Sequence, residues 1–182
     1  QLSDIDFLLW HRQQLTNPPS DFHLLVKMLT YFPFHKTSDK TCANLITGEK
    51  CNIKGPVDWI EGARGSGLDF NQKTYVDALK NGDFDRHQAF SFGCWVKTHA
   101  SSLGAIIAKR DTDNQGRGWS LDMKSQDLEI SLIHSDTNKI AVDFKNALKN
   151  DTWNHLVVTY DGSSKAAGIS VYVNSVLQKS TI

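Results

Sequence analysis

Apolar and polar residues alternate through much of the second half of the chain. Between residues 90 and 96, Phe90, Phe92, Cys94 and Val96 occupy every second position, which places them on one side of a strand. Similar short segments follow, separated by clusters of Gly, Asn and Asp. Many short strands with turn residues between them predict an all-β sandwich or barrel. The predicted strands cover residues 90–96, 105–109, 118–124, 128–134, 140–144, 155–160 and 169–173.

The start of the chain follows a different pattern. Ser3 and Asp6 are spaced as a helix N-terminal cap, the apolar residues that follow recur at helical intervals, and the proline pair beginning at Pro18 ends the pattern. We therefore expect residues 1–20 to form a short helical linker, and residues 21–182 to form one domain.

The region between this helix and the regular strands is less uniform. A continuous apolar run predicts a buried strand over residues 28–34. Residues 35–67 are polar and rich in glycine, so we expect irregular loops there, with short strands near residues 45–46 and 51–53.

Charge and length exclude several classes of partner. The 182 residues carry 20 Lys and Arg against 20 Asp and Glu, so the chain lacks the positive excess that nucleic-acid binding or a polybasic membrane anchor requires. No apolar run approaches the roughly 20 residues that cross a bilayer, which argues against membrane insertion.

The N-terminal residues lack the pattern of a signal peptide, and we expect this end to have been cut. The acidic residues comprise seventeen Asp and three Glu, a bias towards turns.

Three cysteines permit at most one internal disulfide. Cys42 and Cys51 flank a short polar segment, whereas Cys94 lies in an aromatic run. Two interpretations stay open for the first pair, a disulfide in an oxidising compartment and two free thiols. The seven histidines show no spacing typical of a zinc site.

Four ordered motifs resemble the laminin-G-like branch of the concanavalin A-like jelly rolls. Residues 153–162 (WNHLVVTYDG) and 171–175 (VYVNS) are similar to a characteristic strand, turn and hairpin of that family. Upstream segments agree in the same order, and the resemblance spans roughly residues 28–178. It implies an antiparallel jelly-roll β-sandwich. The upstream segments are residues 31–34, 62–70 and 90–97.

Two features depart from the family pattern. The hairpin turn is Asn174-Ser175 where the family usually has Asp-Gly, so the turn type is in question. The family's domain also continues into further strands beyond the position of Ile182. We therefore expect C-terminal strands to be missing and a sheet edge to be exposed. Such an edge would favour a homo-oligomer or a strand-exchanged dimer.

The same jelly roll hosts glycoside hydrolases, which need paired carboxylates. The laminarinase-like enzymes carry Glu-x-Asp-x-x-Glu on one strand. Here the nearest match is Asp127 and Glu129, with Leu132 in place of the third acid. We interpret this segment as a strand with one buried side and one solvent-exposed side, which argues against an enzyme.

Calcium is the one cofactor that the sequence suggests. Asp111, Asp113 and Asn114 lie in a short loop that partly matches an EF-hand, although Gln115 and Asp122 depart from its ligand pattern. Related laminin-G-like domains and pentraxins commonly bind calcium through rim loops. The simpler alternative is a hairpin tip rich in turn-forming residues.

Carbohydrate binding would require an exposed aromatic ring. Trp119, Trp59 and Tyr75 lie beside predicted loops and are the candidate ligand-binding residues, although the simpler interpretation of Trp119 is a residue that covers the edge of the core. The aromatic residues within strand patterns are predicted to lie in the core. These are Trp95, Trp153, Tyr160 and Tyr172.

These observations favour a non-catalytic recognition or adhesion module of a larger extracellular, periplasmic or cell-surface protein, with carbohydrate or another protein as its ligand. Two alternatives stay open. One is a structural spacer without a ligand of its own, and the other is a degenerate glycoside hydrolase.

Overall fold

A computed structural model describes residues 28–78 and 80–181. The chain divides into two compact units, with the boundary between Asn81 and Gly82, and each unit is described by itself. The helix expected within residues 1–20 lies outside the described residues. Within the described ranges, no helix is long and apolar enough to cross a membrane.

The first unit contains two small antiparallel sheets. One has the strand order β1-β2-β5 and the other pairs β3 with β4. The predicted strand at residues 51–53 is confirmed as part of β2, whereas the other strands of this unit were not predicted. Their bounds are Thr41–Ala43 for β1, Lys50–Lys54 for β2, Asp58–Glu61 for β3, Ser66–Asp69 for β4 and Tyr75–Asp77 for β5.

Two strand predictions in this unit are wrong. Residues 28–34 form no strand, and residues 45–46 lie in a turn. Tyr31 donates its backbone N–H to Asn44 Oδ1 (3.0 Å) and accepts the N–H of Leu45 through its carbonyl (2.9 Å). Residues 28–34 are therefore held in place through the hydrogen bonds of Tyr31 to the buried Asn44 side chain and to the Leu45 backbone. They do not form the continuous ladder of backbone hydrogen bonds that a strand requires.

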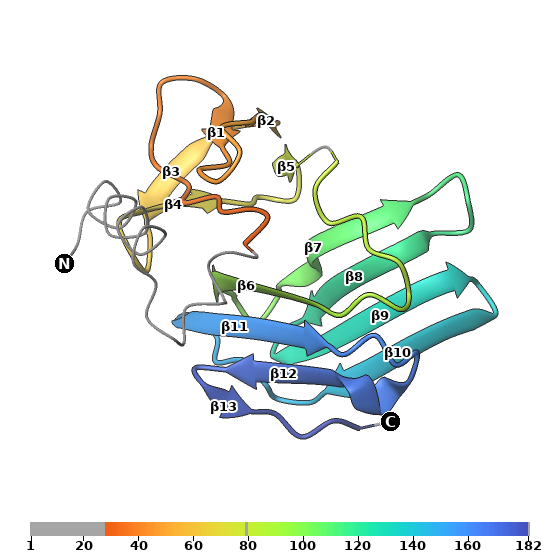
Figure 1. The fold of residues 1–182 in the computed structure, drawn as a ribbon. Coiled ribbons are helices and arrows are strands. Elements are labelled where there is room, and N and C mark those ends of the chain that lie inside the picture. Colours follow the sequence, from red (N-terminus) through yellow and green to blue (C-terminus); the bar gives the residue numbers. More distant parts are fainter. Residues whose placement is uncertain (1–27, 79, 182) are drawn as a thin grey trace, which may run out of the picture. The chain divides into compact units, whose positions relative to one another are not determined.

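The second unit is a β-sandwich of two four-stranded antiparallel sheets (Figure 1). One sheet has the order β10-β9-β8-β7 and the other β13-β12-β11-β6. All seven strands predicted for this region are confirmed, and only the short β13 was missed. The bounds are Phe90–Lys97 for β6, Leu103–Asp111 for β7, Arg117–Lys124 for β8, Asp127–Ser135 for β9, Asn138–Phe144 for β10, Trp153–Tyr160 for β11, Ile169–Val173 for β12 and Val176–Leu177 for β13.

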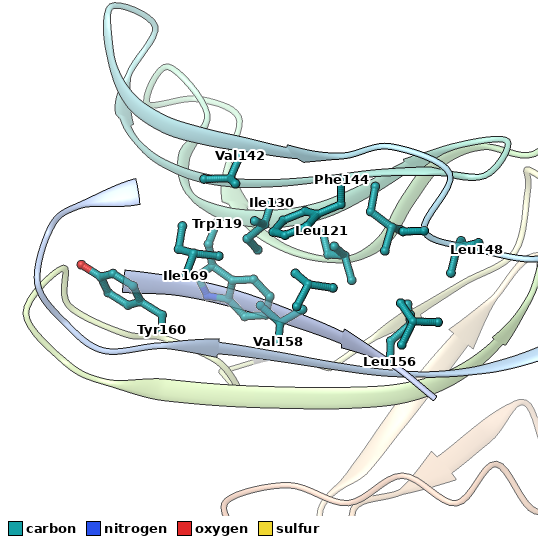
Figure 2. Close-up of a cluster of buried hydrophobic side chains, with 14 of the residues drawn as sticks. Trp119, Leu121, Ile130, Val142, Phe144, Leu148, Leu156, Val158, Tyr160 and Ile169 are labelled. Carbon is teal, nitrogen blue, oxygen red and sulfur yellow. The ribbon is translucent and has the colours of Figure 1, made fainter. Parts of the chain in front are cut away.

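Side chains from both sheets fill the space between the two layers (Figure 2). Strand β11 shows the pattern clearly, because every second residue from Asn154 to Tyr160 is buried. Burying one large apolar side chain contributes about 1.5–3 kcal/mol, so this cluster is the main source of stability in the unit. Its members include Trp119, Leu121, Ile130, Val142, Phe144, Leu148, Leu156, Val158, Tyr160 and Ile169.

Three of the four strand aromatics predicted for the core lie on the outer side of their sheet. Tyr160 is buried as expected, but Trp95 is 41% exposed, and Trp153 and Tyr172 are only partly buried. Their positions follow from strand alternation. The inward positions of β6 begin at Phe90 and continue at even numbers, so an odd-numbered residue such as Trp95 must face outward.

The hairpin between β12 and β13 has a two-residue turn. Val173 pairs with Val176, and Asn174 and Ser175 between them have φ values of 51° and 68°. Positive φ at both central residues is the pattern of a type I′ turn. This answers the question that the Asn-Ser sequence raised, because the turn keeps the left-handed geometry although its second residue is serine.

Two different substitutions of Ser175 should therefore change the stability of the second unit in opposite directions. We expect Ser175→Gly to stabilise the second unit by about 0.5 kcal/mol, because glycine adopts the left-handed region without a steric cost. Ser175→Val should destabilise it by about 1 kcal/mol, because β-branching disfavours positive φ. Chemical denaturation monitored by circular dichroism measures both changes. Equal effects of the two substitutions would contradict this account of the turn.

The outer edge of β10 is contacted by the last described residue. Thr181 donates its N–H to the carbonyl of Asp143 (2.9 Å) and accepts the Asp143 N–H in return (3.4 Å). The expected missing strands and the oligomer or strand-exchanged dimer stay predictions.

Candidate ligand-binding surface

Five side chains lie on the outer side of the β13-β12-β11-β6 sheet, and we call them the aromatic face: Trp95, Lys97, Trp153, His155 and Tyr172. In the strand register, Trp95 lies opposite His155 and Lys97 lies opposite Trp153. Their side chains meet across the two strands. The Trp95 and His155 ring centroids are 4.9 Å apart, and Lys97 Nζ lies 5.7 Å from the centroid of the Trp153 ring.

The aromatic face extends onto β12. Tyr172 pairs with Val157 of β11, which is two residues beyond His155 and on the same side of the sheet. Asn174, in the hairpin turn, accepts the backbone N–H of His155 through Oδ1 (2.9 Å) and donates its own backbone N–H to the His155 carbonyl. These two bonds fix the turn against β11. The result is a row of rings with polar groups at its margin.

The three residues predicted to bind a ligand are not gathered in one site. Trp119 is only 6% exposed and lies in the sandwich core, where its Nε1–H donates to the Gly82 carbonyl (2.8 Å). Its predicted role in sugar stacking is therefore corrected, because neither face of its ring is open. Trp59 lies on β3 and is partly buried, and Tyr75 lies on β5 and is 58% exposed. These two belong to separate sheets of the first unit.

The acidic segment of β9 has partners that do not suit glycosidase chemistry. Asp127 accepts the Asn146 N–H (2.8 Å) and forms an ion pair with Lys145 (3.0 Å). The hydrogen bond from Asn146, followed by Lys145, lowers the pKa of Asp127. A general acid for glycosidic cleavage needs a raised pKa instead. Glu129 accepts the Ser131 hydroxyl (2.9 Å), and Leu132 packs against the core.

Sequence reasoning did not reveal that Glu129 lies in a row of carboxylates. In the register, Glu129 is opposite Asp122 of β8 on one side and Asp143 of β10 on the other. Like charges directly opposite on neighbouring strands destabilise a sheet. This row of carboxylates could not be predicted from the sequence of β9 alone, because it depends on how β8, β9 and β10 pair.

We therefore expect Glu129→Gln to stabilise the second unit by about 0.2–1 kcal/mol at neutral pH and low salt. The amide removes the charge and can still accept the Ser131 hydroxyl. Because salt screens exposed charges, the gain should shrink at high ionic strength. Paired denaturation curves at low and high salt test this, and a destabilised variant at low salt would contradict it.

The predicted calcium loop is a hairpin tip between β7 and β8. Asp111 Oδ1 accepts the Asp113 N–H (3.2 Å), and the Asn114 carbonyl accepts the Arg117 N–H (3.0 Å). No group of three or more His, Cys, Asp or Glu residues within the described ranges is placed to hold a metal ion. The loop carboxylates thus do not form a gathered ligand set. Calcium binding stays a prediction, which a calcium-dependent rise in melting temperature would support and an unchanged value would refute.

The two cysteines that flank the first hairpin are neighbours in space. Cys42 of β1 and Cys51 of β2 are directly paired, both are buried and both are free thiols. A disulfide between them stays a prediction.

The chain belongs to the concanavalin A-like lectin/glucanases superfamily, whose laminin-G model matches residues 70–182. This matched region includes every strand of the sandwich. Membership confirms the resemblance that the sequence motifs indicated. No curated protein sequence matches the chain.

Solved structures share the fold at low sequence identity. The binding domain of paraclostridial mosquitocidal protein 1 has a TM-score of 0.60 and 14% identity, covering 84% of this chain and 39% of its own. The binding domain of botulinum neurotoxin DC, solved with rat synaptotagmin II, has a TM-score of 0.53 and 15% identity, covering 78% and 37%. An S-layer domain-containing protein from Clostridium thermocellum has a TM-score of 0.53 and 14% identity, and the match covers 84% of this chain and 71% of that protein's chain.

The chain therefore spans about two fifths of the length of the two toxin binding domains. A second structure of the neurotoxin DC domain, in complex with SialylT, has a TM-score of 0.52 and 17% identity, and covers 78% of this chain and 37% of its own. At these identities the similarity shows the fold alone.

Proposed function

We propose that this chain is a non-catalytic recognition module of a larger secreted or surface protein, and that it binds carbohydrate through the aromatic face. The observation that carries the proposal is the position of Trp95. It lies on the outer side of the sheet with 41% of its surface exposed, beside the ring of His155. The sandwich core does not require a large aromatic residue at this position.

The chemistry of the aromatic face suits a sugar ring. An indole offers a flat apolar surface against which the C–H groups of a pyranose can stack, while nearby polar groups bind the hydroxyls. Lys97 and His155 flank Trp95 on the same side of the sheet. Cross-strand pairing fixes the backbone at these positions, and the contact between the Trp95 and His155 rings limits their motion, so little ordering of these two rings is needed on binding.

The comparisons support a binding role without identifying the ligand. One neighbouring domain was solved with a protein and also with SialylT. The partners of Asp127 argue against hydrolysis, because they favour its ionised form. We favour carbohydrate over protein because the flat, exposed ring of Trp95 lies beside the hydrogen-bonding groups of Lys97 and His155, a combination that matches a sugar ring.

A printed array of neutral and sialylated oligosaccharides tests the proposal with the full chain. We expect binding by the wild type, and a loss of affinity of about tenfold or more in Trp95→Ala, because central aromatic residues dominate binding surfaces. Tyr75→Ala is the matched control, since Tyr75 is an exposed strand aromatic in the other unit.

Three results would overturn the proposal. Loss of binding in Tyr75→Ala but not in Trp95→Ala would place the site in the first unit. Binding of a protein but no oligosaccharide would show the wrong ligand class. Absence of any ligand would favour the structural spacer.

A further inference from the structure

The pairing of Cys42 and Cys51 can be defined more closely from the backbone bonds on either side. Ile53 donates its N–H to the Lys40 carbonyl (2.9 Å), and Asn44 donates its N–H to the Glu49 carbonyl (2.8 Å). These two pairs lie two positions away from Cys42–Cys51 in opposite directions. Because antiparallel pairs alternate between hydrogen-bonded and non-hydrogen-bonded types, Cys42 and Cys51 form a hydrogen-bonded pair.

This pair type brings the two Cα atoms within the range that a disulfide spans. Hydrogen-bonded antiparallel pairs have Cα atoms about 5.5 Å apart, and disulfides span Cα separations of roughly 4.4–6.8 Å. The two side chains also share one side of the sheet, because both are buried while their neighbours on β2 are exposed. A disulfide also needs Cβ atoms about 3.5–4.5 Å apart, which is closer than the roughly 4.5–5.5 Å typical of directly opposite residues, so the two strands must approach slightly to join them. A bond closed in this way is more easily reduced.

We propose that Cys42 and Cys51 form a reversible disulfide that closes the β1–β2 hairpin when the protein meets a disulfide oxidant such as oxidised glutathione. In the first step, the thiolate of one cysteine attacks the oxidant, which releases one reduced glutathione and leaves a mixed disulfide. The second cysteine then displaces the other glutathione. Two thiols are oxidised, one glutathione disulfide is reduced to two glutathione molecules, and the two protein thiol protons pass to the released thiolates.

The position of the hairpin makes this exchange accessible. Strand β1 is the outermost strand of its sheet, so it can open locally without disrupting β2 and β5. Burial, with the neighbouring Cys51 adding to the effect, raises the pKa of Cys42 to about 11, and burial also raises the pKa of Cys51. Because the thiolate is the nucleophile, the oxidation rate should increase about tenfold per pH unit between pH 7 and 9.

Cys94 provides an internal comparison. It lies on β6 opposite Leu156, has no cysteine opposite it, and faces the sandwich core. Burial raises its pKa to about 11 as well. The difference between the two sites is therefore the presence of a paired thiol. Cys94 should stay reduced under conditions that oxidise the hairpin pair.

Peptide mapping of the full chain tests the proposal directly. Lys50 separates the two cysteines, so trypsin cleaves between them. After treatment with oxidised glutathione and blocking of free thiols, we expect a non-reduced digest to contain residues 41–50 joined to residues 51–54. Dithiothreitol should separate them. In the oxidised protein, amide exchange across residues 44–53 should be slower than in the reduced protein.

The contradicting results are equally definite. Separate glutathione adducts on Cys42 and Cys51, or two unreacted thiols alongside complete oxidation of a reference dithiol peptide, would overturn the proposal. Cys94→Ser is the control variant and should leave the joined peptides unchanged. Because the mapping uses the wild-type chain, it does not depend on the folding of a cysteine variant. Its outcome is also independent of carbohydrate binding.

Discussion

Trp119→Ala should destabilise the second unit by about 3–5 kcal/mol, the range for loss of a large buried aromatic. The ring packs against Phe92, Phe90 and Phe84, with centroid separations of 4.9, 5.6 and 6.2 Å. Its Nε1–H also satisfies the Gly82 carbonyl. The substitution therefore creates a cavity and removes a hydrogen-bond donor at the same time. Chemical denaturation monitored by near-ultraviolet circular dichroism measures the loss.

Two further variants separate these contributions. Trp119→Phe keeps an aromatic ring but not the donor, so we expect a smaller loss of about 1–3 kcal/mol. Trp95→Ala is the matched control on the outer side of the sheet, and it should cost about 1 kcal/mol or less. If Trp95→Ala proved as destabilising as Trp119→Ala, the assignment of one tryptophan to the core and the other to the surface would be wrong.

Asn44→Ala should destabilise the first unit by about 2–4 kcal/mol. Asn44 is fully buried, and its Oδ1 accepts the backbone N–H groups of Tyr31 and Ile46 at 3.0 Å each. Alanine would leave both donors without this acceptor, and an unsatisfied buried polar group costs about 1–3 kcal/mol. Hydrogen exchange is the appropriate measurement, because it should show loss of protection at Tyr31 and Ile46 in particular.

A nearby threonine provides the control for this variant. Thr47 Oγ1 accepts the Glu49 N–H (3.2 Å), but this bond is exposed to solvent. Water can replace the lost acceptor, so Thr47→Ala should cost about 0.5 kcal/mol or less. Equal effects of Asn44→Ala and Thr47→Ala would contradict the role of the buried amide in holding the residues around Tyr31.

The sandwich could be predicted from sequence because its signal is local. Each strand of the second unit carries its own alternation, and residues such as Leu156 and Val158 mark the inner side without knowledge of the partner strand. The first unit could not be predicted in this way. Residues 28–34 form an apolar run typical of a strand, yet their position depends on a hydrogen bond that the Tyr31 N–H donates to the side chain of Asn44, 13 residues further along the chain.

The candidate site was harder to predict than the fold. The position of Trp119 beside a loop makes it a candidate binding residue, with coverage of the core edge as the simpler interpretation, and the strand pattern around Trp95 predicts a position in the core. The alternation that placed Phe92 and Cys94 inside also required Trp95 to face outward. The alternation along β6 therefore predicts the outward position of Trp95, whereas the general preference of aromatic residues for the core predicts the opposite. The pairing of Trp95 with His155, in contrast, required the register of two strands.

The most direct test of the proposed binding surface is an NMR titration that follows the indole N–H signals of the five tryptophans. The titrant is the oligosaccharide that the array identifies, and single Trp→Phe variants assign the signals. We predict shifts at Trp95 and Trp153, which lie on the aromatic face, and no shift at Trp119, whose N–H is bonded to Gly82 in the core. Shifts confined to Trp59, with Trp95 and Trp153 unchanged, would contradict the account.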